Sequence, residues 1–226
     1  MNGELLAAWL VAIGTLLLAV IAIFQDVVRA WILRPKLAVS ASTQPPCSHA
    51  NVTAIKNKTS LEPDHVSGVY MRVKVENRGN STARGVEVFA ERLAKEQQDG
   101  SYRNVTAFDP MNLVWSHIGS PIMEAIPPRM HKYCGLGRIF DPQKRHHFPL
   151  QQINGVSPEQ TVFEFDLQVK PFTKSHVVPP GKYRLYLTVG AANAAPRAFT
   201  VEISISGLWH EDEAKMLGEG IGIRVV

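Results

Sequence analysis

The N-terminal part of the chain is one long apolar segment. From Leu5 to Phe24 it reads LLAAWLVAIGTLLLAVIAIF, and 18 of these 20 residues are apolar. Twenty residues of α-helix extend about 30 Å, which matches the hydrocarbon thickness of a bilayer. The pattern therefore predicts one N-terminal transmembrane helix. A cleaved signal peptide is the alternative, because residues 28–30 (Val-Arg-Ala) end on a small residue, but such a peptide has a basic start and a shorter apolar stretch.

The flanks of this segment predict its limits and its orientation. The helix is expected to continue until Pro35, which cannot extend it, so that residues 1–34 form an anchor with an interfacial extension. Trp9 and Trp31 would then lie about 33 Å apart, a spacing suited to the two interfacial belts of a membrane. The first basic residues all follow the apolar segment: Arg29, Arg34 and Lys36. The positive-inside rule therefore predicts a single-pass protein of the bacterial inner membrane with a cytoplasmic C-terminal domain.

After Pro35 the apolar residues recur at every second position, as they do in half-buried strands. The clearest example is VYMRVKVEN, in which Val69, Met71, Val73 and Val75 alternate with polar neighbours. A turn at 77–80 and a strand over 86–90 complete a hairpin. Further strands are expected at 37–41, 110–117, 132–139, 163–169, 183–189 and 199–205. Long loops are expected at about 42–67 and at 118–160, the second on both sides of the strand at 132–139, and a short helix is expected at 210–217.

This succession of strands indicates the fold class. About seven strands without a long helix between them argue against alternating β–α units. We therefore expect a mainly β protein, with an antiparallel immunoglobulin-like β-sandwich over residues 35–226 preceded by the single N-terminal transmembrane helix.

Two blocks of the sequence resemble a known kind of module. VYMRVKVENRGNSTARGVEV resembles the hairpin of bacterial immunoglobulin-like modules of the CARDB type, and PPGKYRLYLTV resembles their closing strands. The whole arrangement is also similar to uncharacterised bacterial membrane-anchored proteins with an Arg-Pro-Lys-Leu junction and a C-terminal Trp-x-x-Asp/Glu-Glu segment. The resemblance implies a fold and a location, with no reaction attached.

The charge balance outside the apolar segment is mildly basic, and much of the excess lies in one stretch. Residues 1–24 contain one acid and no base, which leaves 24 bases and 19 acids for the remaining 202 residues. The stretch 129–147 contains five bases against Asp141 alone: Arg129, Lys132, Arg138, Lys144 and Arg145. It could face anionic lipid headgroups, or it could be a solvated loop. Nucleic-acid binding is not favoured, because no aromatic residues are interleaved with these charges in a stacking pattern.

Two short motifs carry the residue types of a metal site. Cys47-Ser-His49 and His131-Lys-Tyr-Cys134 together offer two thiolates and two imidazoles. These would form a complete tetrahedral set for a structural zinc ion if the fold brings the motifs together. The alternatives are a small buried Cys134 beside surface histidines or, in the reversed orientation, a Cys47–Cys134 disulfide. Zinc is the only cofactor that the sequence suggests.

Two further groups of residues have more than one interpretation. Glu164 and Asp166 lie on the same face of an expected strand and are interpreted as ordinary solvent-facing charges. Four Asn-x-Ser/Thr triplets are either turn and strand-edge residues or acceptors of glycans: Asn51, Asn57, Asn80 and Asn104.

The sequence contains no motif of an established catalytic mechanism, such as Gly-x-Ser-x-Gly or His-Glu-x-x-His. We therefore expect a membrane-anchored, non-enzymatic protein-interaction or scaffold module, with membrane lipid and an unidentified protein as its partners. A zinc-stabilised structural domain is one alternative. An exported adhesion or carbohydrate-binding module is the other, if the orientation is reversed.

Overall fold

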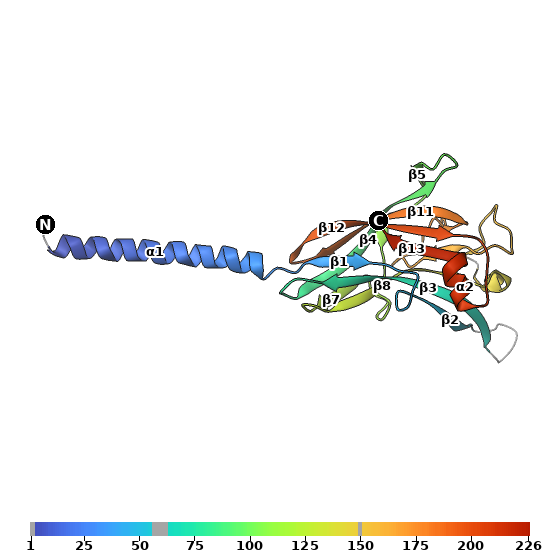
Figure 1. Cartoon of the computed structure of the whole chain (residues 1–226), viewed down its shortest axis with the longest axis horizontal. Coiled ribbons are helices and arrows are strands. Elements are labelled where there is room, and N and C mark those ends of the chain that lie inside the picture. Colours follow the sequence, from blue (N-terminus) through green and yellow to red (C-terminus); the bar gives the residue numbers. More distant parts are fainter. Residues whose placement is uncertain (1–2, 56–62, 149–150) are drawn as a thin grey trace.

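The computed structural model of the chain describes residues 3–55, 63–148 and 151–226, with the backbone alone for 26–32. A long helix, α1 (Gly3–Ile32), projects from one end of a β-sandwich (Figure 1). Its segment Gly3–Gln25 is long and apolar enough to cross a membrane, and none of its most apolar window is buried inside the structure. The N-terminal helix and the antiparallel β-sandwich expected from the sequence are thus confirmed.

The first sheet has the order β1-β3-β8-β9-β10, and β2 also pairs with β3. All its pairings are antiparallel. Its strands are β1 (Leu37–Ser40), β2 (Ser48–Ile55), β3 (Asp64–Asn77), β8 (His131–Phe140), β9 (Phe163–Phe165) and β10 (Val177–Val178).

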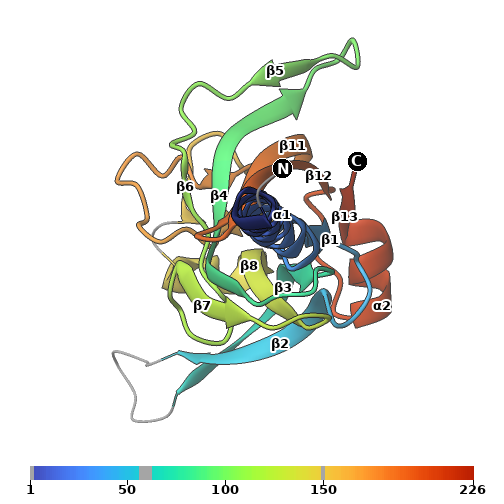
Figure 2. The ribbon, with the colours of Figure 1, turned by 90° about the vertical axis from the view of Figure 1, so that its left-hand side faces the viewer.

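The second sheet has the order β13-β12-β11-β4-β5, and the short strands β6 and β7 also pair with β4. Its strands are β4 (Ala83–Glu96), β5 (Tyr102–Asn104), β6 (Met111–Asn112), β7 (Ile122–Ile126), β11 (Gly181–Ala191), β12 (Ala194–Ile205) and β13 (Ile221–Val225). Seen along the helix axis, α1 meets the sandwich near the middle of its end (Figure 2).

The core lies between the two sheets and is built from the alternating apolar residues of the long strands. The four alternating residues of β3 from Val69 to Val75 are at most 1% exposed, and Val86, Val88 and Ala90 of β4 face them fully buried. The same alternation on β11 and β12 buries Leu185, Leu187, Val201 and Ile203. The long strands expected from period-two patterning are therefore present. The strand expected at 163–169 is shorter than expected, because β9 covers only Phe163–Phe165 and Val169 is 60% exposed.

Irregular segments close both sides of the sandwich. On one side, Ser42 after β1 forms a bridge with Arg224 of β13. On the other side, the segment after β6 bridges to the first sheet through Leu113–Leu167 and Trp115–Cys134. The strand expected at 110–117 is therefore wrong as one continuous strand, because this segment passes from one sheet to the other.

Three expectations about loops and helices need correction. The expected loop 42–67 contains β2, whose polar residues lie on an edge strand and so lack apolar alternation. The expected loop 118–160 contains β7 and a 3-10 helix, η1 (Pro142–His147). The helix expected at 210–217 is shorter, with α2 (Glu213–Lys215) followed by a π-turn over Met216–Gly220.

Asn77 holds the junction between α1 and the sandwich. Its buried side chain accepts hydrogen bonds from the backbone N–H groups of Lys36 and Gly79, at 3.2 and 3.0 Å. Its amide nitrogen donates to the carbonyls of Ser81 and Ile126, at 2.7 and 2.9 Å. One side chain thus connects the segment after α1 to two turns of the sandwich. Gly79 is required there, because a Cβ at that position would lie 2.3 Å from a backbone oxygen of the junction.

Candidate functional site

A concavity lined by both polar and apolar side chains lies on the outer face of the first sheet, the face turned away from the core. It has a volume of about 660 Å³ and lies between β2 and the turn at 114–119. We call it the outer hollow. Its polar and charged lining residues include His49, Thr53, Tyr70, Arg72, Arg138 and Asp166.

Strand register places several of these side chains in one row across the sheet. His49 of β2 is directly opposite Tyr70 of β3, Tyr70 is opposite Arg138 of β8, and Arg138 is opposite Glu164 of β9. Directly paired residues point to the same face of a sheet. Because their neighbours Val69 and Ile139 are buried in the core, this row projects from the outer face.

The β2 side of the outer hollow is held by aromatic and polar contacts. The Tyr70 hydroxyl lies 2.9 Å from the Thr53 hydroxyl, and the rings of His49 and Tyr70 are stacked. Arg72 lies with its Nη2 3.3 Å from Nδ1 of His49 and with its guanidinium over the ring of Tyr133. Burial, and then the positive charge of Arg72, lower the pKa of His49, which favours its neutral form at neutral pH.

The β9 side contains a buried carboxylate that the sequence interpretation missed. Glu164 is 2% exposed, with ion pairs to Arg138 and Lys170 and a hydrogen bond from Gln151. Burial alone would raise the pKa of Glu164, but Arg138, Lys170 and Gln151 together lower it to about 2. The expectation of a solvent-facing charge is therefore wrong for Glu164. Alternation assigned the correct face of the strand, but it carries no information about segments that cover that face.

Asp166 borders the outer hollow beside this network. Its Oδ1 lies 4.0 Å from Nε of Arg138, and a Cβ on Gly135 would lie 2.7 Å from its Oδ2. Burial raises the pKa of Asp166, and Arg138 offsets part of that effect. The outer hollow thus presents hydroxyl groups, a cation and a carboxylate on a rigid sheet, while the charge of Glu164 is already neutralised by its ion pairs. Such an arrangement suits hydrogen-bonded recognition.

The four residues proposed as zinc ligands do not come together. Cys134 is opposite Val73, so its fully buried thiol faces the core, whereas His131 is opposite the outward-facing Glu76 and His49 opposite Tyr70. Among the described residues, no group of three or more His, Cys, Asp and Glu side chains is arranged to hold a metal ion. Cys47 and Cys134 are both free thiols. The zinc hypothesis stays a prediction that this geometry does not support.

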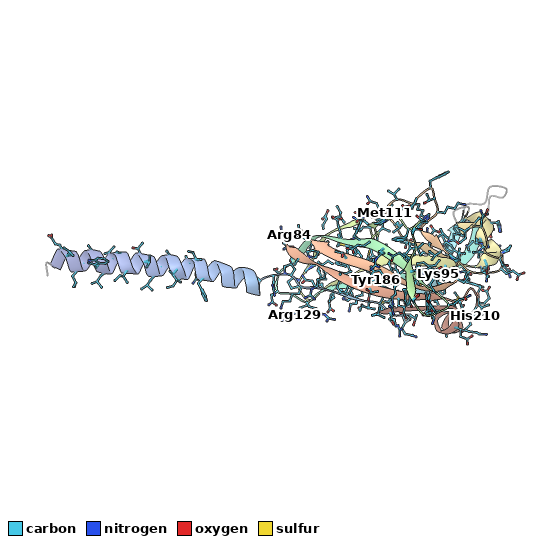
Figure 3. All side chains as sticks on the ribbon, turned by 90° about the horizontal axis from the view of Figure 1, so that it is seen from above. Arg84, Lys95, Met111, Arg129, Tyr186 and His210 are labelled. Atoms are coloured by element: carbon cyan, nitrogen blue, oxygen red, sulfur yellow. The ribbon has the colours of Figure 1, made fainter. Side chains whose placement is uncertain are left out.

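The basic stretch 129–147 is spread along the sandwich because β8 runs the length of the first sheet. Arg129 lies at the end that α1 enters (Figure 3). Arg138 pairs with Glu164, and Lys144 pairs with Asp64. Arg145 is 9% exposed and donates to the carbonyls of Ser157 and Gln160. The five bases, with Lys132 near the start of β8, do not form one continuous patch.

The expected membrane-interface residues are placed in part. Trp9 is 64% exposed on α1, and Arg34 and Lys36 are exposed at the junction. The side chains of Arg29 and Trp31 lie outside the described part of the chain.

The asparagines of the Asn-x-Ser/Thr triplets are exposed where the structure describes them. Asn51, Asn80 and Asn104 lie on β2, in the β3–β4 turn and on β5, and Asn57 falls outside the described residues. Their modification stays an open prediction.

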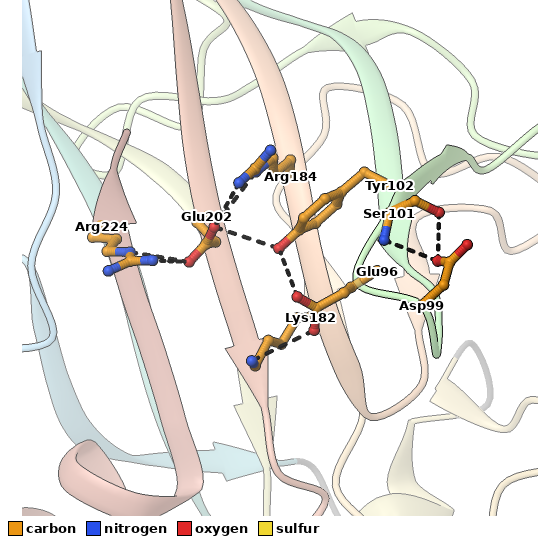
Figure 4. A network of polar contacts seen from close by, with 8 residues as sticks. All are labelled: Glu96, Asp99, Ser101, Tyr102, Lys182, Arg184, Glu202 and Arg224. Atoms are coloured by element: carbon orange, nitrogen blue, oxygen red, sulfur yellow. Dashed lines mark hydrogen bonds and ion pairs between the residues drawn. The ribbon is translucent and has the colours of Figure 1, made fainter.

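A second polar network covers the outer face of the second sheet (Figure 4). Glu202 accepts hydrogen bonds from Arg224, Arg184 and Tyr102, while Glu96 pairs with Lys182. Burial raises the pKa of Glu202, but Arg224 and Arg184 outweigh it, so the net shift is downward. This network binds its charges to one another, whereas the outer hollow combines polar side chains with a concavity of about 660 Å³. The outer hollow is therefore the better candidate for a binding site.

Comparison with known proteins adds no relative to this description. No protein-family model, curated protein or solved structure matches the chain. The resemblance to CARDB-type modules therefore stays a prediction based on the two blocks of sequence.

Proposed function

We propose that the chain is a membrane-anchored, non-enzymatic binding module of the bacterial inner membrane, and that its outer hollow binds a segment of a partner protein. The observation that carries this proposal is the row from His49 through Tyr70 to Arg138 along the hollow. A volume of about 660 Å³ is within the ordinary range for ligand sites. Hydroxyls and charges of both signs suit the main-chain and polar side-chain groups of a peptide segment.

Two features support binding over catalysis. Glu164 has a pKa of about 2, far from the range in which a carboxylate exchanges protons at neutral pH. Its oxygens are also engaged by Arg138, Lys170 and Gln151. Glu164 thus serves the structure of the first sheet, and the side chains that line the outer hollow, such as His49, Tyr70 and Arg72, are the ones that recognise the partner.

Photocrosslinking in the native membrane tests the site. A benzophenone amino acid at Thr53, on the rim of the outer hollow, is expected to give one adduct of discrete mass. The control carries the same group at Thr188 of β11, on the outer face of the second sheet, and is expected not to give this adduct. The same product from both positions, or no product from Thr53, would contradict the proposal.

Reconstitution with the purified adduct partner makes the test quantitative. Arg72 and Arg92 both stack on tyrosines, but Arg92 lies on the second sheet over Tyr186. Arg72→Ala is expected to weaken binding by about tenfold, the effect of losing one charge-assisted contact. Arg92→Ala is expected to leave the dissociation constant unchanged. Equal effects of the two variants on the dissociation constant would rule out the outer hollow as the binding site.

Reporter fusions after Val226 test the orientation. We propose a cytoplasmic domain because Arg34 and Lys36 follow the apolar segment and no base precedes it. A reporter active only in the cytoplasm is expected to work, and one active only outside is expected to fail. The opposite result would favour the exported adhesion or carbohydrate-binding module.

A further inference from the structure

Three turns of the sandwich gather around the end of α1. Besides the side-chain bonds already described, the backbone of Asn77 makes two bonds to the β7–β8 turn. Its carbonyl accepts from the N–H of Arg129, and its N–H donates to the carbonyl of Met130. The β11–β12 turn joins the same end through the backbone of Arg84. The N–H of Arg84 donates to Oδ1 of Asn193, and its carbonyl accepts from the N–H of Ala192. We call this surface the anchor-side end; it consists of residues 33–36, 78–82, 127–130 and 191–194.

The charge of the anchor-side end has one sign. Its four segments contain four bases and no acid: Arg34, Lys36, Arg78 and Arg129. Arg84 lies just beside it, and both Arg84 and Arg129 are seen next to the helix junction in Figure 3. Glu76 of β3, just outside these segments, pairs with Arg78 at 3.0 Å. A basic excess remains after that pair is counted.

Arg129 and Met130 lie side by side in the turn before β8 and project from the anchor-side end. Arg129 has a φ of 60°, one of two positive φ values found among the described non-glycine residues. This left-handed conformation is unfavourable for a residue with a Cβ. Met130 beside it is 49% exposed. The turn thus presents a cation and an apolar side chain together, in a backbone conformation that glycine would adopt more easily.

The length of α1 places this end close to a membrane surface. The apolar segment ends at Phe24 and the helix at Ile32, eight residues or about 12 Å later. The headgroup layer is about 5 to 7 Å thick, and the Debye length is about 8 Å at physiological salt. With α1 across a bilayer, the anchor-side end would begin within electrostatic range of the headgroups.

We infer that the anchor-side end of the sandwich is a lipid-binding surface, on which Arg78, Arg84 and Arg129 bind anionic headgroups and Met130 inserts between them. This surface would hold the sandwich upright on the bilayer and keep the outer hollow at a fixed height. The inference rests on the proposed anchoring of α1, and the test below separates the two.

The test uses the full chain in lipid vesicles. Met130→Cys carries an environment-sensitive fluorophore, and headgroup-spin-labelled lipid quenches it. The control label is at Leu208, an exposed apolar residue beyond the opposite end of β12. Both native cysteines are buried, and the unsubstituted chain treated in the same way gives the background.

In vesicles of equal parts phosphatidylcholine and phosphatidylglycerol, quenching at 130 is expected to be at least about twofold that at 208. It should fall in pure phosphatidylcholine, and also in 1 M salt, where the Debye length is about 3 Å. Arg78→Gln combined with Arg129→Gln should reduce it towards the value at 208. Arg92→Gln with Arg103→Gln, two exposed arginines of the second sheet, should leave it unchanged.

Flotation of the vesicles tells the outcomes apart. If the chain floats with the vesicles but the label at 130 is quenched no more than the label at 208, the lipid-binding surface is refuted and the anchor stands. Equal quenching with and without phosphatidylglycerol refutes the role of the arginines. If the chain does not float, both the anchor and this inference are refuted.

Discussion

Nη2 of Arg138 lies 3.1 Å from Oε1 of Glu164, on the outer face of a sheet where the carboxylate is only 2% exposed. Lys170 and Gln151 complete its shell. Neutralising one charge of a buried ion pair is destabilising, because it leaves the other buried charge without compensation. The pKa of Glu164, about 2 against an ordinary 4.5, therefore links this network to the pH dependence of stability.

Because the folded-state pKa of Glu164 is depressed, its contribution is complete above about pH 4.5 and is lost as the pH falls towards 2. The shift corresponds to about 3 kcal/mol at neutral pH. Asp166 has a raised pKa, so its protonation relieves a cost over part of the same range and offsets some of this loss. Glu164→Gln should lower the free energy of unfolding by about 3 kcal/mol at pH 7, and the difference from the parent chain should narrow towards pH 2.

Urea unfolding of the full chain in detergent, followed by near-ultraviolet circular dichroism, measures this difference. Glu91→Gln on the exposed face of β4 is the control, and it should leave the free energy of unfolding unchanged at every pH. A deficit in Glu164→Gln that stays constant between pH 7 and 2 would contradict the linkage.

The Asn77 amide makes four hydrogen bonds while fully buried, so removing it leaves four backbone groups without their partner. We expect Asn77→Ala to lower the free energy of unfolding by about 3 kcal/mol, since a buried unsatisfied polar group costs about 1 to 3 kcal/mol. Asn193→Ala is the matched control: its side chain also bonds two backbone groups, but it is exposed. Its loss should cost less than about 1 kcal/mol in the same measurement, and equal costs would refute the junction role of Asn77.

The long strands could be predicted from the sequence because their burial is regular. On β3, β4, β11 and β12 each alternate residue contacts the same core, so a period of two reports the fold directly. β2 could not be found in this way, because it pairs only with β3 and seven of its eight residues are exposed or half-buried. The segment at 110–117 was only partly predictable, because it bridges both sheets and its pairing depends on their separation.

The candidate site was harder to predict than the strands, for a physical reason. The row from His49 to Glu164 is assembled by register between four strands, and more than 50 residues separate β3 from β8 in the chain. Glu164 and Arg138 each follow an ordinary polar alternation, and only the covering segment with Gln151 turns that alternation into a buried ion pair. The zinc hypothesis failed to gain support for the same reason: the order of residues in Cys47–His49 and His131–Cys134 does not specify which face of the sheet each occupies.

Arg129→Gly should make the fold more stable and the lipid contact weaker. At a φ of 60° glycine is not penalised, and the gain in the free energy of unfolding is expected to be about 1 kcal/mol. Arg129→Ala separates the two effects, because it removes the guanidinium but keeps the Cβ, and it should bring no gain in stability. Both variants should reduce the quenching of the label at position 130. If the stability of Arg129→Gly is unchanged or lower, the conformation of Arg129 is not strained.

Removing residues 1–32 should release a folded sandwich that stays in solution and no longer sediments with membranes. The reason is that the most apolar window of α1 is not buried against the rest of the chain, so its loss exposes no core. The cut is placed before Leu33 because the backbone of Lys36 bonds to Asn77 and Arg78. The circular dichroism of the truncated chain should retain its β signal, with a cooperative thermal transition.

Removing residues 1–36 is the matched comparison, and it should lower the transition temperature because the Asn77 amide loses its bond from Lys36. Aggregation of both truncated chains would mean that α1 packs on the sandwich, and equal transition temperatures would mean that the junction bonds do not stabilise it.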